Sequence, residues 1–392
     1  MNNHRLLCSE YGSFRDQVQI KLKGEILTKP CTIMDPMAGT APFIPFVETS
    51  GFKAYFNDIL PLHFFMNRAK TYEVFQNFRE RGYEWFFEQM LKCMSSLENK
   101  TLLISDNWIE DTILDGLKKA WNSADYCDDK SATLLKAAIL LCVRPFASIT
   151  KSNNPTWLKF GGISSGRSID EIAKDALTKF DKYYSNHYKA PILKRGECIF
   201  SIQNGADLQL PEKAEILLTS PPYCNRLDPF VLYGPENYFL SSIGLASNDL
   251  CLVTTTKVKD YDTMSTDFEF LITQSEYARK LLTTIKKSPK KDDPGYYLKY
   301  YTRYFSMLFK VLNNALGNLS ETGKAYIVTQ DNYHRGELIN IDQVLVELFS
   351  TRGWRTRSVD TWERHHMGLR NVSRDHAFVR PKMTERLTEL SR

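Results

Sequence analysis

The chain has 392 residues, of which 43% are hydrophobic and 25% charged, and its formal net charge is +5 at pH 7. These values are those of an ordinary globular protein that is long enough for two or three domains. No apolar run approaches the roughly 20 residues that cross a bilayer, and the first residues lack the hydrophobic region of a signal peptide. We therefore expect a cytoplasmic protein with no membrane partner.

Cysteine and charge distribution narrow the possibilities further. The eight cysteines are scattered with no Cys-x-x-Cys pair, which argues against a zinc module and against a disulfide framework. His365 and His366 have no acidic residues at a spacing suited to metal binding, so we predict no metal site. Residues 351–392 carry ten Arg or Lys against five Asp or Glu, which indicates either a solvated surface or a contact for a polyanion.

The first part of the chain has the pattern of a nucleotide-binding unit. The expected elements, in chain order, are a helix or strand near residues 18–27, a strand at 31–35, a small-residue turn, an apolar stretch at 43–47 and a strand at 53–56. The strand at 31–35 ends in Asp35, and Asp58 follows shortly after the strand at 53–56. Strand, loop, helix and strand with a terminal acid make up the nucleotide-binding half of a doubly wound sheet. Gly39 lets the backbone approach a ligand closely, and Asp58 is placed to bind a ribose diol.

The middle of the chain is mainly helical by pattern. Apolar residues recur three and four positions apart in five segments, residues 69–78, 85–97, 108–121, 131–143 and 169–184. A loop at residues 152–162 combines amide, aromatic and basic side chains, namely Asn153, Asn154, Trp157 and Lys159. This loop is either a plain connector or a segment that reads or wedges a base stack.

A strand-rich pattern returns from residue 196. The expected strands are residues 198–202, 214–218, 325–329 and 377–379, and the expected helices are 296–316 and 341–350. A turn at residues 204–207 joins the first two strands and contains Asn204 and Asp207. The lysine-rich residues 286–293 are predicted to form a solvated loop, with phosphate contact as the alternative.

The strand at residues 214–218 leads through Thr219 into Ser220, Pro221, Pro222 and Tyr223. Two prolines that follow a strand force the chain out of the sheet, because neither can donate to the strand ladder. The carbonyls of Ser220 and Pro221 are then held in fixed directions beside a hydroxyl and an aromatic ring. Such a bend can accept hydrogen bonds from an amino group and stack on the ring that carries it. The alternative is a rigid turn whose tyrosine packs on the core.

Together these two motifs resemble those of the S-adenosylmethionine-dependent DNA methyltransferases that modify exocyclic amino groups. The cofactor loop of that family commonly reads Asp-Pro-Phe-x-Gly-x-Gly, and residues 35–41 match it at Asp35, Pro36 and Gly39. The catalytic motif of the family is Asp/Asn/Ser-Pro-Pro-Tyr/Phe/Trp, and residues 220–223 match it at all four positions. The likeness covers residues 31–70 and 196–350.

The resemblance implies an α/β fold, a doubly wound Rossmann-like methyltransferase sheet with a mainly helical insert. Residues 1–65 and 196–392 would form the catalytic domain, and residues 66–195 the insert that reads the DNA target. It also implies S-adenosylmethionine as cofactor and DNA as partner, and it leaves open a cognate restriction endonuclease or defence-system component.

The resemblance assigns roles to residues of both motifs and of the loops around them. The expected catalytic residues are Ser220, Pro221, Pro222 and Tyr223. The expected cofactor-binding residues are Asp35, Pro36, Gly39, Thr40, Asp58, Asn204, Asp207, Tyr11 and Phe14, with a simple turn as the alternative role of Asn204 and Asp207. The expected nucleic-acid contacts are Asn153, Asn154, Trp157, Lys159 and Arg226.

In that family, serine at the first position of the catalytic motif favours cytosine N4 as the methylated atom. If the protein is an enzyme, the alternative methylated atoms are adenine N6 in DNA and the amino nitrogen of guanine in RNA. Ala41 and Pro42 stand where the family has its second glycine and the next residue, so a catalytically silent nucleic-acid-binding relict is a third alternative. Cys31 follows a proline, as does the nucleophile of carbon-5 cytosine methyltransferases, but it precedes the cofactor strand and is predicted to be a buried strand residue.

Overall fold

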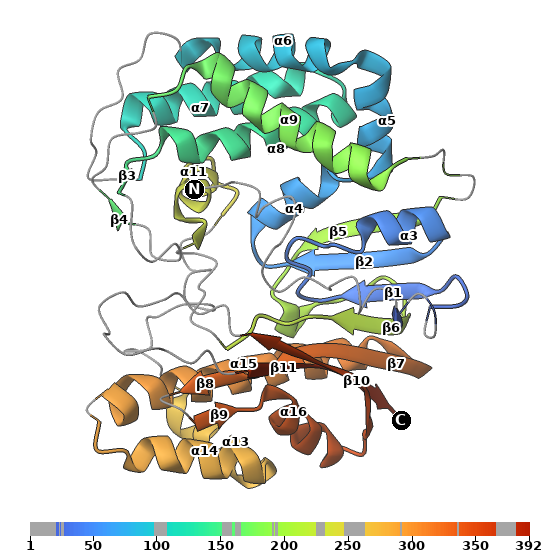
Figure 1. Cartoon of the computed structure of the whole chain (residues 1–392), viewed down its shortest axis with the longest axis vertical. Coiled ribbons are helices and arrows are strands. Elements are labelled where there is room, and N and C mark those ends of the chain that lie inside the picture. Colours follow the sequence, from blue (N-terminus) through green and yellow to red (C-terminus); the bar gives the residue numbers. More distant parts are fainter. Residues whose placement is uncertain are drawn as a thin grey trace. The chain divides into compact units, whose positions relative to one another are not determined.

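In a computed structural model of the chain, residues 21–22, 24, 27–97, 108–150, 159–160, 166–189, 192, 195–224, 232–246, 263–290, 292–334, 337–365 and 382–392 are described. The fold is α/β, with a mostly parallel central sheet of seven strands in the order β10-β11-β7-β6-β1-β2-β5 (Figure 1). The seven strands are β1 (Thr32–Asp35), β2 (Lys53–Asp58), β5 (Glu197–Ile202), β6 (Ala214–Thr219), β7 (Leu319–Gln330), β10 (Arg355–His365) and β11 (Lys382–Ser391). This arrangement is compatible with a Rossmann-like fold.

Strand direction changes at one end of the sheet. The pairs β1–β6, β6–β7 and β2–β5 are parallel, whereas β11 runs antiparallel to both β7 and β10. Two small antiparallel pairs lie outside the central sheet, β3 (Ile149–Thr150) with β4 (Lys159–Phe160) and β8 (Asn332–His334) with β9 (Glu337–Ile339).

By their internal contacts the described residues divide into two compact units. Unit 1 contains those of Gly39–Ile202 and Asp228–Thr254, and unit 2 those of Phe14–Ala38, Gln203–Leu227 and Thr255–Arg392. Unit 1 therefore holds β2, β5 and most helices of the first half of the chain. Unit 2 holds β1, β6, β7, β10 and β11.

Unit 1 is built mainly from helices (Figure 1), and all but the first of them share one apolar core. Its helices are α3 (Ile44–Ser50), α4 (Pro61–Arg68), α5 (Tyr72–Arg81), α6 (Tyr83–Met94), α7 (Asp111–Ser123), α8 (Asp129–Val143), α9 (Ile169–His187) and α11 (Gly234–Ser242). Local sequence sets several helix starts. Ser168 and Glu171 form a reciprocal capping box on α9, and Asp128 caps α8 through the backbone N–H of Ser131.

Unit 2 packs four helices beside its strands (Figure 1). They are α13 (Met264–Gln274), α14 (Glu276–Lys287), α15 (Leu298–Gly317) and α16 (Ile341–Ser350). A π-helical turn, η8 (Asp293–Tyr297), precedes α15, and a 3-10 turn, η5 (Gly205–Asp207), lies between β5 and β6. Gly205 is required there because a Cβ would lie 2.7 Å from a methyl group of Val311.

Most expected elements are confirmed, with shifted ends. The helix expected at residues 69–78 is wrong at its start, because α4 ends at Arg68 and a turn precedes α5. The lysine-rich loop is also wrong in part, since Lys286 and Lys287 form the last turn of α14. Three helices between residues 234 and 287 were not expected, and neither was the hairpin of β10 and β11. The strand expected at residues 377–379 lies outside the described residues.

No helix in the part of the chain that the structure describes is long and apolar enough to span a membrane.

A buried ion pair fastens α11 to the other helices of unit 1. Arg144 donates from Nε to Glu236 Oε1 and from Nη2 to Oε2, each at 2.8 Å, and it also donates to the carbonyl of Leu232. Burial by itself would lower the pKa of Arg144, but the Glu236 carboxylate raises it. Glu236 is fully buried, and this guanidinium is the partner that offsets the cost of burying its carboxylate.

We expect Arg144→Ala to lower the free energy of unfolding by about 3–5 kcal/mol, because it leaves the Glu236 carboxylate buried without its partner. Urea denaturation followed by circular dichroism measures this. Arg279→Ala removes a solvent-exposed pair with Glu276 and should change stability little. An equal loss in both variants would contradict the buried pair's role.

Candidate functional site

The Ser-Pro-Pro-Tyr bend begins where β6 ends, beside the end of β1. The two strands are parallel neighbours with Met34 opposite Leu217. Thr219, fully buried, donates from Oγ1 to Asp35 Oδ1 at 2.7 Å. Asp35 Oδ1 also accepts from the backbone N–H of Met37 at 3.1 Å, which fixes the turn after β1. One carboxylate therefore joins the starts of both motifs.

This meeting point has a topological meaning. The strand after β1 in the chain, β2, lies on one side of β1 in the sheet order, whereas the strand after β6, β7, lies on the other side. In open α/β sheets, ligands bind at the carboxyl ends of the strands where the order reverses in this way. The Thr219–Asp35 hydrogen bond lies at that position.

The bend itself is held by side chains from distant parts of unit 2. Ser220 Oγ donates to the Tyr223 hydroxyl at 3.3 Å, and the Tyr223 hydroxyl donates to Glu385 Oε1 at 3.0 Å. Tyr304, on α15, donates to the carbonyl of Pro222 at 2.7 Å. Tyr223 is half-buried while Glu385 on β11 is 1% exposed. The tyrosine is thus anchored at its hydroxyl and keeps part of its surface accessible.

Asn204 and Asp207 form the turn η5. The Asn204 side chain accepts from the backbone N–H of Ala206 at 3.1 Å and donates to Asp207 Oδ2 at 2.9 Å. The turn lies near the loop after β1, because a Cβ on Gly205 would be 3.2 Å from the carbonyl of Pro36. Both side chains therefore have a structural role in the turn, and contact with a cofactor stays a prediction.

In unit 1 the glycine loop is tied to the end of β2. Asp58 accepts from the backbone N–H of Gly39 at 2.7 Å on Oδ2 and from that of Leu60 at 2.9 Å on Oδ1. Nδ1 of the buried His63 lies 3.1 Å from Oδ1, outside good hydrogen-bond geometry. Burial would raise the pKa of Asp58, but His63 and the two N–H groups lower it. A carboxylate oxygen can accept two hydrogen bonds, and ribose binding by Asp58 stays a prediction.

Two polar side chains that the sequence pattern did not single out hold the carbonyls of the same loop. Asn67 donates to the carbonyl of Gly39 at 2.8 Å, and Lys70, only 1% exposed, donates to that of Thr40 at 2.6 Å. No described atom lies within 4 Å of where a Cβ on Gly39 would be. The loop is therefore fixed on its carbonyl side and open beside its glycine. Two polar residues at buried positions, one in the last turn of α4 and one between α4 and α5, are the available sequence signal.

Ala41 occupies the place of the second glycine in the loop motif. It is fully buried with a φ of 40°, in the left-handed region that favours glycine. The loop therefore keeps a glycine-like backbone at this position despite the added Cβ.

Several predicted site residues lie outside the described part of the chain, namely Tyr11, Phe14, Asn153, Asn154, Trp157 and Arg226. Lys159 lies in β4, but its side chain is not described. Among the described residues, no group of three or more His, Cys, Asp or Glu side chains is arranged to hold a metal ion. Cys31 directly precedes β1 and is half-buried, and burial raises its pKa to about 11. Cys224 is buried, with its pKa also raised by burial.

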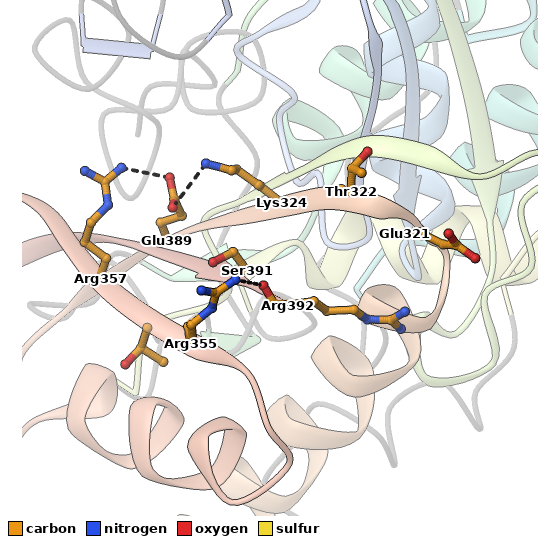
Figure 2. Close-up of a pocket in the computed structure, with 10 residues that line it drawn as sticks. Glu321, Thr322, Lys324, Arg355, Arg357, Glu389, Ser391 and Arg392 are labelled. Atoms are coloured by element: carbon orange, nitrogen blue, oxygen red, sulfur yellow. Dashed lines mark hydrogen bonds and ion pairs between the residues drawn. The ribbon is translucent and has the colours of Figure 1, made fainter.

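A hollow of about 400 Å³ lies elsewhere in unit 2 (Figure 2). It is lined by Glu321, Thr322, Gly323, Lys324, Arg355, Thr356, Arg357, Glu389, Ser391 and Arg392. Glu389 forms ion pairs with two basic side chains (Figure 2). Its Oε2 lies 2.9 Å from Arg357 Nη2, and its Oε1 lies 3.4 Å from Lys324 Nζ. The hollow adjoins the first half of β7, whereas the bend follows the carboxyl end of the parallel strand β6. It is therefore separate from the candidate site.

In comparisons with known proteins, no family model matches this chain and no curated protein matches its sequence.

We expect Ala41→Gly to raise the free energy of unfolding by about 1 kcal/mol. Glycine removes the cost of a left-handed alanine, which exceeds the entropy that glycine adds to the unfolded chain. Urea denaturation measures the difference. Ala54→Gly, in β2, is the control and should destabilise. A destabilised Ala41→Gly variant would contradict the left-handed backbone at Ala41.

Because of Glu48, on α3, we expect the stability of unit 1 to depend on pH. It is fully buried, accepts from the backbone N–H of Tyr72 at 2.9 Å and from the Tyr188 hydroxyl at 2.6 Å, and burial raises its pKa from 4.5 to about 7. Between these pH values the unfolded chain releases a proton that the folded chain keeps. The free energy of unfolding should therefore fall as the pH rises through this window, by up to about 3 kcal/mol.

Glu48→Gln should remove most of this fall, because glutamine does not ionise. Urea denaturation at pH 5 and pH 8 measures it. Glu73→Gln is the matched control, since Glu73 also contacts Arg195 but is 43% exposed in its side chain. An unchanged pH dependence in Glu48→Gln would assign the effect to another group.

Proposed function

We propose that this protein is an S-adenosylmethionine-dependent DNA methyltransferase that modifies an exocyclic amino group, most favourably N4 of cytosine. The observation that carries the proposal is the Thr219–Asp35 hydrogen bond at 2.7 Å. It joins the start of the catalytic motif to the acid of the cofactor motif within one unit, at the point where the strand order reverses. Two short motifs far apart in the sequence thus become one local arrangement.

The sheet supports the same proposal. Counted in chain order, the central strands follow the order third, second, first, fourth, fifth, which is that of doubly wound nucleotide-binding sheets. An antiparallel hairpin, β10 and β11, completes the sheet. The helices α5 to α9 fall within the insert that we propose reads the DNA target.

Each unit, taken by itself, has residues that suit part of the proposed cofactor. The space beside Gly39 admits a close-lying ligand, and the carboxylates of Asp35 and Asp58 suit its polar and cationic groups. Asp35 would hold the methionine end and Asp58 the ribose. When bound, S-adenosylmethionine supplies an activated methyl group. The chain itself must position the amino group that receives it.

The bend has the chemistry for that task. An exocyclic amine is a poor nucleophile because its lone pair is delocalised into the base. Ser220 donates its own hydrogen to Tyr223. The Ser220 Oγ is therefore oriented to accept a hydrogen from the amine. Fixed acceptors gain strength as positive charge develops on the nitrogen. The target base must leave the DNA helix to reach them, and the half-buried ring of Tyr223 offers it a stacking surface.

We expect the purified protein to transfer labelled methyl groups from S-adenosylmethionine to DNA, and mass analysis of the nucleosides identifies the atom. N4-methylcytosine is the expected product. If the product is N6-methyladenine or a methylated RNA guanine, the target base is adenine in DNA or guanine in RNA instead of cytosine. Cofactor binding without transfer to any nucleic acid would disprove the activity. Calorimetry that detects no cofactor binding would support the silent relict.

Tyr223→Ala should cut turnover by about 100-fold and leave cofactor affinity unchanged, because it removes the stacking surface for the base. Asp58→Ala should mainly weaken cofactor affinity. Methyl-transfer assays and calorimetry separate the two effects. Tyr126→Ala, at a tyrosine that is 94% exposed, and Asp181→Ala, on the exposed face of α9, are the matched controls. Equal effects of the two site variants on both quantities would overturn this division of roles.

A further inference from the structure

The hydrogen bonds around the bend form a directed chain that ends on a buried carboxylate. Ser220 Oγ donates to the Tyr223 hydroxyl at 3.3 Å, and that hydroxyl donates to Glu385 Oε1 at 3.0 Å. Glu385 comes from β11, 162 residues after Tyr223 in the sequence. Each donor in the chain points away from the bend and toward Glu385. This is the order needed to carry a proton from Ser220 into the sheet.

We propose that Glu385 is the terminal proton acceptor of the methyl transfer, acting through Tyr223 and Ser220. The inference rests on the proposed function. When an amino nitrogen forms its bond to the methyl carbon, the sulfur–carbon bond breaks and its electron pair stays on the sulfur. The nitrogen becomes positively charged and must lose one proton.

The chain of hydroxyls accounts for that proton. It passes to Ser220 Oγ as the serine hydrogen passes to the Tyr223 oxygen, and the tyrosine hydrogen passes to Glu385 Oε1. Both hydroxyls end neutral and Glu385 ends as a carboxylic acid, which returns its proton to solvent before the next cycle. Glu385 does not touch the base, so its part is played entirely through the two hydroxyls.

The surroundings of Glu385 bear on its pH response. Gln330 on β7 and Trp362 on β10 face it in the strand register, and neither carries a charge. Asp360, further along β10 and opposite Leu387, lies on the same face and pairs with Lys21 at 3.9 Å. The facing group from the bend is the Tyr223 phenol.

A second glutamate on the same strand provides a close control. Glu389 is also buried and accepts from a tyrosine hydroxyl, that of Tyr326, at 2.9 Å. It is held by Arg357 and Lys324 at the separate hollow (Figure 2). Glu389→Gln therefore repeats the chemical change of Glu385→Gln on the same strand without touching the bend.

The test compares pH–rate profiles of methyl transfer by the full chain. Glu385→Gln should lower kcat by about 100-fold, at the low end of proton-transfer catalysis, with KM and cofactor affinity nearly unchanged. The acid limb of the wild-type profile, where Glu385 gains its proton, should disappear. Tyr223→Phe should give the same loss, and the double variant should be no slower than either single variant, because both interrupt one chain. Glu389→Gln should keep the wild-type profile.

A measurement without cofactor or DNA checks the coupling itself. The ring-carbon NMR signal of Tyr223 should respond to pH in the wild-type protein and in Glu389→Gln, but lose that response in Glu385→Gln. If the wild type transfers methyl groups and Glu385→Gln keeps its rate and acid limb, the relay is wrong and the activity stands. If the wild type transfers none, both proposals fall. Additive losses in the double variant would also overturn the relay.

Discussion

The hydrogen bond between Thr219 and Asp35 is the constraint on which the candidate site depends. It joins two parallel strands at the place where the strand order reverses, and only Ser220 separates Thr219 from the two prolines. Because proline cannot continue the strand ladder, the chain must leave the sheet at this position. Any displacement of β6 against β1 would therefore move the bend relative to the carboxylate that begins the cofactor motif. The backbone register of Met34 with Leu217 sets that alignment.

Buried polar groups fix the parts of the fold that must not move. Lys70 and Asn67 hold the carbonyls of the glycine loop, and Asp58 holds one of its N–H groups. Glu385 holds the ring of Tyr223 by its hydroxyl. Each of these groups costs free energy to bury, and each is satisfied by partners from a different element. Such contacts specify one geometry more sharply than apolar packing does, because a hydrogen bond is lost when the donor no longer points at its acceptor.

Much of the architecture could be predicted from the sequence where one local pattern was decisive. The amphipathic spacing of residues 341–350 gives α16 at its predicted ends, and the apolar run that ends at Thr219 gives β6. The failures have physical causes. The spacing of Ala278, Leu281, Leu282 and Ile285 is a sufficient signal for α14, but the run of lysines at its end is also typical of a solvated loop. The hairpin of β10 and β11 is rich in charged residues, and its register is set by pairing with β7, which no local pattern contains.

The sequence by itself determined the two motifs, their order and the rigid bend, because proline, glycine and strand-forming residues act through their own backbone preferences. Only the tertiary structure decided that Asp35 meets Thr219, that Ala41 takes a left-handed conformation, and that Glu385 lies under Tyr223. Those facts depend on contacts between residues far apart in the chain. Their geometry follows from strand register and packing, which are properties of the folded sheet rather than of any segment.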